Sequence, residues 1–180
     1  MNKTVTITEA LAELKTIDSK ISSTEDFLQQ YSFRQGSSID PLADEGGSDK
    51  VIPQRMQALK DLLERKVTIR SAVNNKNAET PLEVCGITRT VAEWIIWRRE
   101  TFKREVMAFQ KILGHVQEAR RVCIEKSFTF IEGAQPSKVT EVSCFVSEAG
   151  LSDKIEQLRE IESTLDGKLS MLNATTTVTI

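Results

Sequence analysis

The chain has 180 residues, a formal net charge of −2 and a sequence pI near 5.6. This balance disfavours a protein that coats nucleic acid, because such proteins are strongly basic. Hydrophobic residues make up 39% of the sequence, which is enough apolar side chain for a folded core. The sequence has no apolar stretch of the ~20 residues that cross a bilayer and no signal-peptide pattern. We therefore expect a protein of the cytoplasm, or part of a virion assembled there.

The first predicted element, over residues 1–35, is a helix that follows a short β-prone arm. Thr6 and Glu9 have the spacing of a capping box, in which both side chains accept hydrogen bonds from free backbone N–H groups. Apolar residues then occupy two positions of a seven-residue repeat, which predicts packing against another helix. The residues of this repeat are Ile7, Ala10, Leu14, Ile17, Ile21 and Leu28.

Residues 36–52 are predicted to form a flexible loop, since glycine, proline and small polar residues replace the apolar repeat there. Pro53 suits the first position of a second helix, over residues 53–77, because the missing N–H has no helical partner at that position in any case. A broad apolar face gives this second helix a surface for packing.

The second half of the chain is predicted to hold a long helix, a hairpin and a last helix. A capping box at Thr90 and Glu93 belongs to the start of the long helix, over residues 88–126. β-prone residues on both sides of a turn predict a β-hairpin over residues 127–146. A leucine at every seventh position predicts a helix over residues 150–173, with a spacing that an intramolecular bundle and a two-chain zipper share.

The two ends of the chain share a motif. The last four residues, Thr-Val-Thr-Ile, repeat Thr4–Ile7 letter for letter and lie in a β-prone arm over residues 174–180. The two arms are either frayed ends or strands that complete a sheet in this chain or in a neighbouring one. Val178 and Ile180 are interaction candidates in the second case. No other internal repeat is evident from the sequence.

No arrangement of residues indicates an active site or a metal centre. Cys85, Cys123 and Cys144 are far apart, and His115 is the only histidine, so neither a zinc site nor histidine-based catalysis is expected. The sequence also contains none of the common nucleophile or phosphate-binding motifs. We therefore predict a protein that is not an enzyme and has no catalytic residue, cofactor or metal.

The most unusual local feature is the run of residues 94–99, Trp-Ile-Ile-Trp-Arg-Arg. Four consecutive apolar residues of a helix cannot all face one side, so some are expected to face a second neighbour. Trp94 and Arg98 are spaced for a cation–π contact, and both residue types are frequent at interface hot spots. Packing in the core and contact with nucleic-acid phosphates are the alternatives. The candidate interaction residues of this run are Trp94, Trp97, Arg98 and Arg99.

Several segments resemble the septicolysin-like family of short bacterial and phage-borne proteins. The residues that carry this resemblance are Ile7–Leu14, Ile69–Thr80, Thr90–Trp94, Arg98–Glu100, Leu165–Leu169 and Asn173–Thr176. Residues Phe128–Val146 depart from the family pattern. The resemblance implies a helical bundle that oligomerises, and it implies neither an activity nor a catalytic residue.

These patterns together predict one mainly α-helical domain over residues 1–180. Its expected architecture is an elongated antiparallel bundle of about four helices, with a small β-hairpin and short β-prone terminal arms. We expect a structural protein that forms homo-oligomers or decorates a larger particle such as a phage virion. The alternative is a regulatory module that binds a protein or nucleic acid through the face of Trp94 and Arg98. A membrane-active toxin is a weaker alternative.

Overall fold

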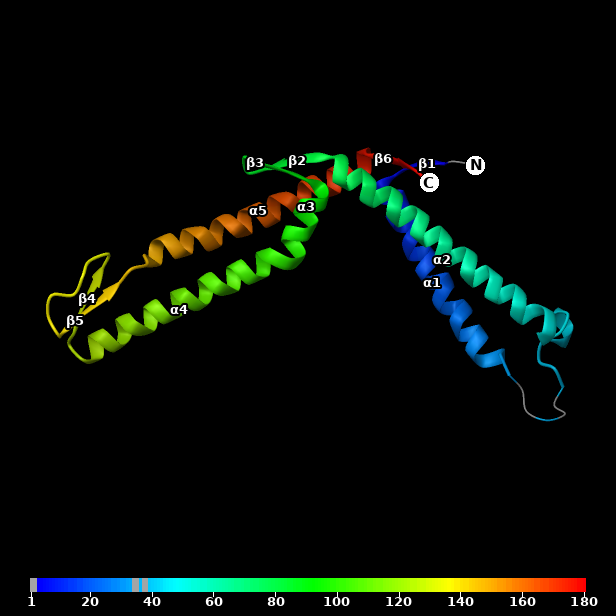
Figure 1. Ribbon diagram of the computed structural model, residues 1–180, viewed down its shortest axis with the longest axis horizontal. Coiled ribbons are helices and arrows are strands. Elements are labelled where there is room, and N and C mark those ends of the chain that lie inside the picture. Colours follow the sequence, from blue (N-terminus) through cyan, green and yellow to red (C-terminus); the bar gives the residue numbers. More distant parts are fainter. Residues whose placement is uncertain (1–2, 34–35, 37–38) are drawn as a thin grey trace. The chain divides into compact units, whose positions relative to one another are not determined.

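The computed structural model describes residues 3–33, 36 and 39–180, and it is mainly α-helical (Figure 1). The chain divides into two compact units, where the sequence had predicted one domain. Unit 1 comprises Met1–Glu79 and Ser170–Ile180, and unit 2 comprises Thr80–Leu169.

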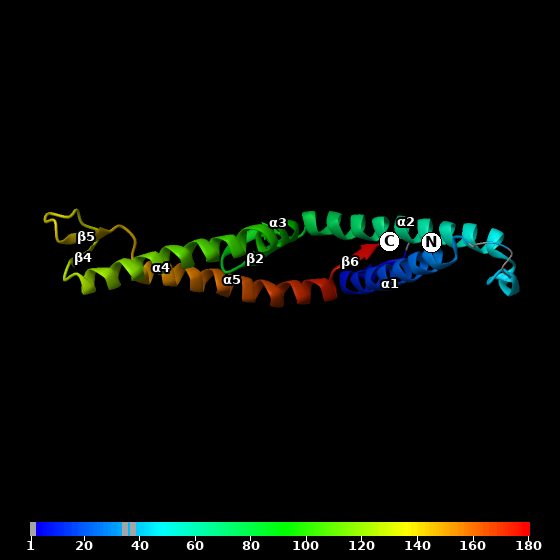
Figure 2. The same ribbon diagram turned by 90° about the horizontal axis from the view of Figure 1, so that it is seen from below.

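Unit 1 is a pair of antiparallel helices with two paired strands at one end (Figures 1 and 2). The strands come from the two ends of the chain and pair in antiparallel register, with Val5 opposite Val178. The last turn of α5 leads into the second of these strands. The elements of unit 1 are β1 (Thr4–Thr6), α1 (Ile7–Tyr31), the 3-10 turn η1 (Ala43–Glu45), α2 (Ser48–Glu79) and β6 (Thr177–Thr179).

Unit 2 is also built from two long antiparallel helical segments, which α4 and α5 form in Figure 1. An antiparallel strand pair precedes the first segment, and a second strand pair lies between the two segments. The elements of unit 2 are β2 (Pro81–Val84), β3 (Ile87–Thr90), α3 (Val91–Ile96), the π-helical segment η2 (Trp97–Phe102), α4 (Lys103–Glu125), β4 (Thr129–Glu132), β5 (Glu141–Cys144) and α5 (Glu148–Thr175).

The boundaries around the first loop differ from the prediction. α1 ends at Tyr31, and residues 34–35 of the predicted helix lie outside the described residues. α2 begins at Ser48, so Pro53 lies inside the helix and not at its first position. The carboxylate of Asp40 explains the early start, because it accepts hydrogen bonds from the N–H of Leu42 at 3.0 Å and from that of Ser48 at 2.8 Å. A free N–H of the first helical turn is satisfied in this way.

The strands of unit 2 also differ from the prediction. Residues 88–90, predicted as helix, belong to β3, and β2–β3 is the small β-hairpin of the fold. Its two-residue turn has positive φ at Cys85 (48°) and Gly86 (78°), as the turn that matches the twist of a hairpin requires. The hairpin expected over residues 127–146 is instead a parallel pair, in which Thr129 lies opposite Glu141.

The two units repeat one local arrangement, which begins with their capping boxes. The Thr6 hydroxyl accepts a hydrogen bond from the Glu9 N–H at 3.2 Å, and the Glu9 carboxylate accepts one from the Thr6 N–H at 2.8 Å. Thr90 and Glu93 make the same two bonds at the same two distances. Both capping boxes predicted from the sequence are therefore confirmed.

The strand that pairs beside each cap is also equivalent in the two units. The Ile7 N–H donates to the Thr176 carbonyl at 2.9 Å, and the Val91 N–H donates to the Thr80 carbonyl at 2.9 Å. Both carbonyls belong to the sequence Asn-Ala-x-Thr, which occurs at residues 77–80 and again at 173–176. The chain is therefore an internal repeat of strand, helix, connection, helix and strand.

The shared asparagines set the correspondence between α2 and α5. Counted back from Asn77 and Asn173, Ile69 is equivalent to Leu165, and neither side chain is exposed to solvent. α1 of unit 1 aligns with the continuous helical segment of α3, η2 and α4 in unit 2 when one extra residue is allowed in unit 2. The π-helical turn of η2 accommodates that residue. Insertions of this kind, together with a longer connection in unit 2, hide the repeat from a search for a constant period.

Candidate interaction surfaces

The two tryptophans of the predicted interaction cluster lie in the core of unit 2. Trp94 is 1% exposed, and its indole N–H donates to the Leu82 carbonyl at 2.9 Å. Trp97 meets Trp94 edge to face, with ring centroids 5.4 Å apart, and packs with Val84 and Leu165. Trp94 and Trp97 therefore attach the β2–β3 hairpin to the helices, and they do not form an exposed recognition patch.

The two arginines of this cluster have different surroundings. The Arg98 guanidinium forms ion pairs across to α5, at 2.6 Å from Asp166 and 3.7 Å from Glu162. The spacing of Trp94 and Arg98 allows a cation–π contact, but the guanidinium that lies over the Trp94 ring is that of Arg89 of the hairpin, 4.9 Å from the ring centroid. Arg99 is exposed and borders a groove. The other residues that line this groove are Ile95, Arg98, Phe102, Lys103, Glu162 and Leu169.

The terminal candidates Val178 and Ile180 are also internal. Their exposed fractions are 5% and 7%, and both side chains belong to the core cluster of unit 1. The backbone of Ile180 exchanges two hydrogen bonds of 2.9 Å with Lys3. The ends of the chain are therefore not frayed. They form strands that pair with each other within one chain.

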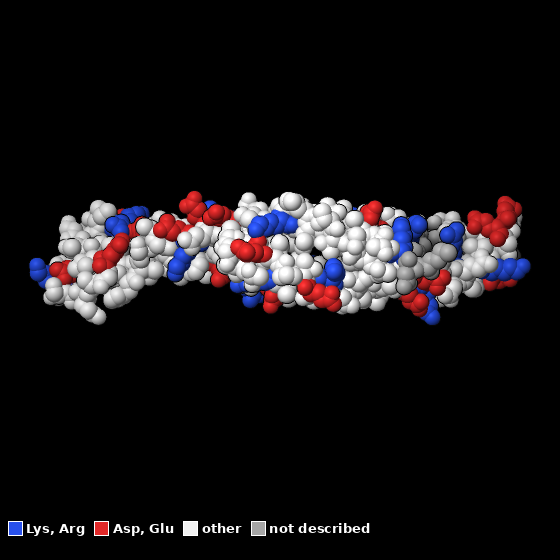
Figure 3. Space-filling model, turned by 90° about the horizontal axis from the view of Figure 1, so that it is seen from above, with Lys and Arg blue, Asp and Glu red and all other residues white. Residues whose placement is uncertain are grey.

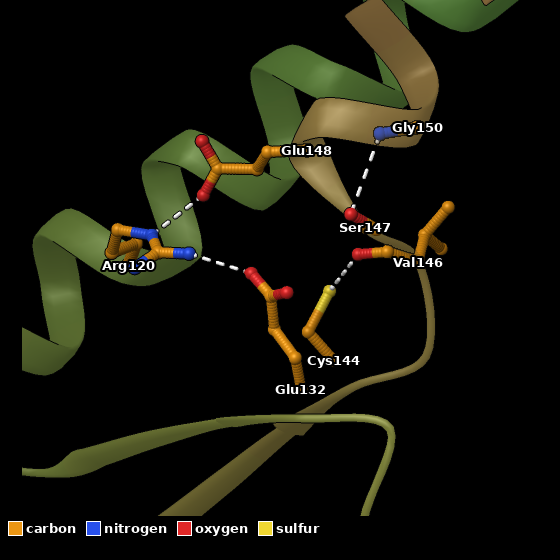
Figure 4. A network of polar contacts seen from close by, with 7 residues as sticks. All are labelled: Arg120, Glu132, Cys144, Val146, Ser147, Glu148 and Gly150. Atoms are coloured by element: carbon orange, nitrogen blue, oxygen red, sulfur yellow. Dashed lines mark hydrogen bonds and ion pairs between the residues drawn. The ribbon is translucent and has the colours of Figure 1, made fainter. Parts of the chain in front are cut away.

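A compact polar network joins α4, β4 and the start of α5 in unit 2 (Figure 4). The Arg120 guanidinium of α4 donates to Glu148 at the start of α5 at 2.6 Å and to Glu132 of β4 at 2.7 Å. The two carboxylates raise the pKa of Arg120, with the hydrogen bond to Glu148 as the main cause. The guanidinium also lies over the Phe130 ring, 4.6 Å from its centroid. The two hydrogen bonds that Figure 4 draws from Arg120 therefore link α4 to β4 and to the start of α5.

The described residues contain no group of three or more His, Cys, Asp or Glu side chains that could hold a metal ion. Cys85 is exposed, Cys123 is buried and Cys144 is half-buried, and all three are free thiols. None of the described helices combines the length and apolarity needed to span a membrane. On the face drawn in Figure 3, basic and acidic side chains are interspersed and do not gather into a basic surface.

α2 carries an exposed surface of mainly apolar residues that the sequence patterns did not single out, and we call it the outer face. It consists of Met56, Lys60, Leu63 and Val67. Met56 is 58% exposed, Leu63 45% and Val67 64%. With 3.6 residues per turn, these four residues share one narrow stripe, roughly 130° around the helix from Ile69 and Val73, which face α1.

The equivalent surface in unit 2 is polar. Counted from the shared asparagines, Met56 corresponds to Ser152, Leu63 to Arg159 and Val67 to Ser163. All three equivalents have polar side chains, although α5 occupies the same place in its unit as α2 in unit 1. A helix in this position therefore does not need apolar residues on its outer face in order to fold.

The chain matches no protein-family model, no curated protein and no solved structure. The resemblance to septicolysin-like proteins stays a prediction.

Proposed function

We propose that this chain is a non-enzymatic structural protein whose role is to assemble with further copies of itself. The observation that carries the proposal is the limited burial within each unit. The buried core of each unit is formed by the facing sides of its helices and by residues of the strand pair at their end, so much of the circumference of each long helix remains exposed. Further helices commonly complete a helix pair of this kind, because a pair alone leaves apolar surface in water.

Exposed apolar side chains lie along the open surfaces. They include Met56 and Val67 of α2, Ile124 of α4, and Met171 of α5. Association would remove such side chains from water, which favours binding by about 25 cal/mol per Å² of apolar area, before the costs of association are subtracted. Attachment to a larger particle, such as a virion, would use the same kind of surface.

The alternative function, binding through the face of Trp94 and Arg98, has less support. Trp94 is enclosed by its own unit, and Arg98 already contacts Glu162 and Asp166. Binding at this face would therefore have to replace existing contacts. Arg99 and Lys103 have no ion-pair partner within the described residues, so they are the positions at which nucleic-acid binding would first be sought.

Sedimentation equilibrium of the full chain tests the proposal. We expect an average mass that rises with protein concentration in the micromolar range and exceeds the 20.2 kDa of one chain. A mass that stays at that of one chain at every concentration up to ~100 μM, where even a weak specific dimer would be populated, would contradict the proposal.

A further inference from the structure

We infer that the outer face of α2 is a symmetric interface, on which two copies of this chain pack their α2 helices against each other in antiparallel orientation. This inference rests on the proposed self-assembly and names the surface that carries it. The second copy would add two helices to the two of unit 1 and so complete a four-helix arrangement. Such an interface is isologous, meaning that both copies contribute the same residues.

The spacing of the outer face is self-complementary. When two α2 helices are placed antiparallel around a two-fold axis between residues 61 and 62, Met56 of one copy lies opposite Val67 of the other. Lys60 then lies opposite Leu63 of the other copy, and its aliphatic stem can cover that side chain while its ammonium group reaches water. Each apolar residue of the outer face thus meets an apolar group across the axis.

The charges beside this stripe are complementary in the same register. Lys60 and Glu64 are 68% and 67% exposed, and within one helix they make only a 3.8 Å ion pair. In the symmetric arrangement, Lys60 of one copy lies next to Glu64 of the other, and symmetry forms this pair twice. Opposite charges at the rim of an interface favour one partner and one register.

The equivalent positions of unit 2 show what a helix looks like in this fold without such an interface. Lys60 and Glu64 correspond to Glu156 and Glu160, which are both acidic. Two α5 helices in the same arrangement would bring four carboxylates together, and their apolar contacts would be replaced by Ser152, Arg159 and Ser163. The repeat therefore restricts the interface to unit 1 and favours a second copy of α2 as its occupant.

The first experiment gives the outer face the residues that the chain already carries in unit 2. The variant combines Met56→Ser, Leu63→Arg and Val67→Ser in the full chain, and far-UV circular dichroism confirms its helix content. We expect its dimer dissociation constant, measured by sedimentation equilibrium, to rise at least ~100-fold above that of the unchanged chain. Met107→Ser is the matched control, since Met107 is 55% exposed on α4, and it should leave the dissociation constant unchanged.

The second experiment tests the register and does not depend on the apolar substitutions. Glu64→Lys places like charges next to each other across the two-fold axis, and we expect it to weaken the dimer by roughly 10-fold. Lys60→Glu combined with Glu64→Lys exchanges the charges in both copies. This double variant should bind several-fold more tightly than Glu64→Lys alone, although it loses the aliphatic stem of Lys60 that covers Leu63.

The outcomes separate this interface from self-assembly in general. A chain that associates equally well with and without the three outer-face substitutions would overturn the interface and leave self-assembly standing. Failure of the charge exchange to restore association would contradict the antiparallel register. A monomeric unchanged chain would overturn both proposals.

Discussion

Units 1 and 2 build the same arrangement of strands, caps and helices from different core residues. In unit 1, the row between the helices contains the small Ala10, and the backbones of α1 and α2 run close together along the pair. In unit 2, Trp94 occupies the position equivalent to Ala10, and the backbones of α4 and α5 stay farther apart. The caps and strand pairs therefore define the fold, while the sizes of the core side chains set the distance between the helices.

The two units also differ in which helix carries the acidic partners of the ion pairs between their helices. In unit 1, acids of α1 meet bases of α2, with Glu13 at 2.9 Å from Arg65 and Asp18 at 2.6 Å from Lys66. In unit 2, the base Arg98 precedes α4 and the acids lie on α5. This reversal of charge favours pairing within each unit, because a helix exchanged between the units would meet like charges.

The largest difference between the units should appear when Trp94 is replaced by alanine. Trp94→Ala removes the largest buried side chain of unit 2, and we expect a loss of stability of about 3–5 kcal/mol. Both tryptophans of the chain lie in unit 2, so the fluorescence of Trp97 during urea unfolding reports on that unit alone. Met107→Ala is the control. An unfolding midpoint equal to that of the control would contradict the assignment of Trp94 to the core.

The equivalent residues Ile69 and Leu165 test whether the units unfold separately. Each is fully buried, and replacement by alanine should cost about 2–5 kcal/mol in its own unit. We expect Leu165→Ala to shift the tryptophan fluorescence transition, and Ile69→Ala to shift only part of the circular dichroism transition. A single transition that both variants shift equally would show that the two units unfold as one.

The two capping boxes should contribute equally, because their hydrogen bonds have the same lengths. Thr6→Ala and Thr90→Ala should each destabilise their unit by about 1 kcal/mol. Fluorescence for unit 2 and circular dichroism for both units measure the two effects. If only one of the two substitutions lowered stability, the two caps would not be energetically equivalent. Thr16→Ala provides a control at an exposed threonine away from either cap.

Acid should weaken both caps. The pKa of Glu9 is lowered from its ordinary 4.5 mainly by the hydrogen bond from the Thr6 N–H, and the pKa of Glu93 is lowered by the same bond from Thr90. Because folding lowers these pKa values, the caps contribute fully above their ordinary value and lose their contribution as the pH falls through the folded values. Urea unfolding between about pH 6 and pH 3 should therefore show a weaker pH dependence for Glu93→Gln. An unchanged dependence would contradict this account.

The smallest expected effect is at the turn of the β2–β3 hairpin. Cys85 has a positive φ, which asparagine adopts more readily than cysteine, and Asn-Gly is a favoured sequence for this turn. Cys85→Asn should stabilise unit 2 by about 0.5 kcal/mol, by analogy with other substitutions that suit the backbone conformation. The position has no counterpart turn among the described residues of unit 1, so thermal unfolding followed by Trp97 fluorescence should detect the whole effect.

Local patterns predicted a large part of the fold, because their causes are local. The seven-residue repeats identified the helices, and both capping boxes were found from residues three positions apart. The parallel pairing of β4 with β5 could not be predicted, because pairing direction depends on how the connecting residues return. The early start of α2 was also missed, since it depends on Asp40 reaching Ser48.

The candidate surface was harder to predict than the fold. Trp94, Val178 and Ile180 were chosen because apolar residues crowd there, but crowding does not distinguish a core from an interface. Met56 and Leu63 were not chosen, because in the sequence they look like part of one broad core face together with the row that faces α1, and Val67 was not singled out. Only the comparison with the polar residues at the equivalent positions of α5 distinguishes the outer face of α2 from its core-facing row.

The sequence by itself determined the mainly helical character, the capping residues Thr6 and Thr90, and the β-prone ends of the chain. These features follow from backbone hydrogen bonding and periodicity within a few residues. Only the tertiary structure decided that the ends pair with each other, that the chain forms two units, and which apolar side chains remain in water. Burial is a property of contacts between residues that are distant in the sequence, so no local pattern could supply it.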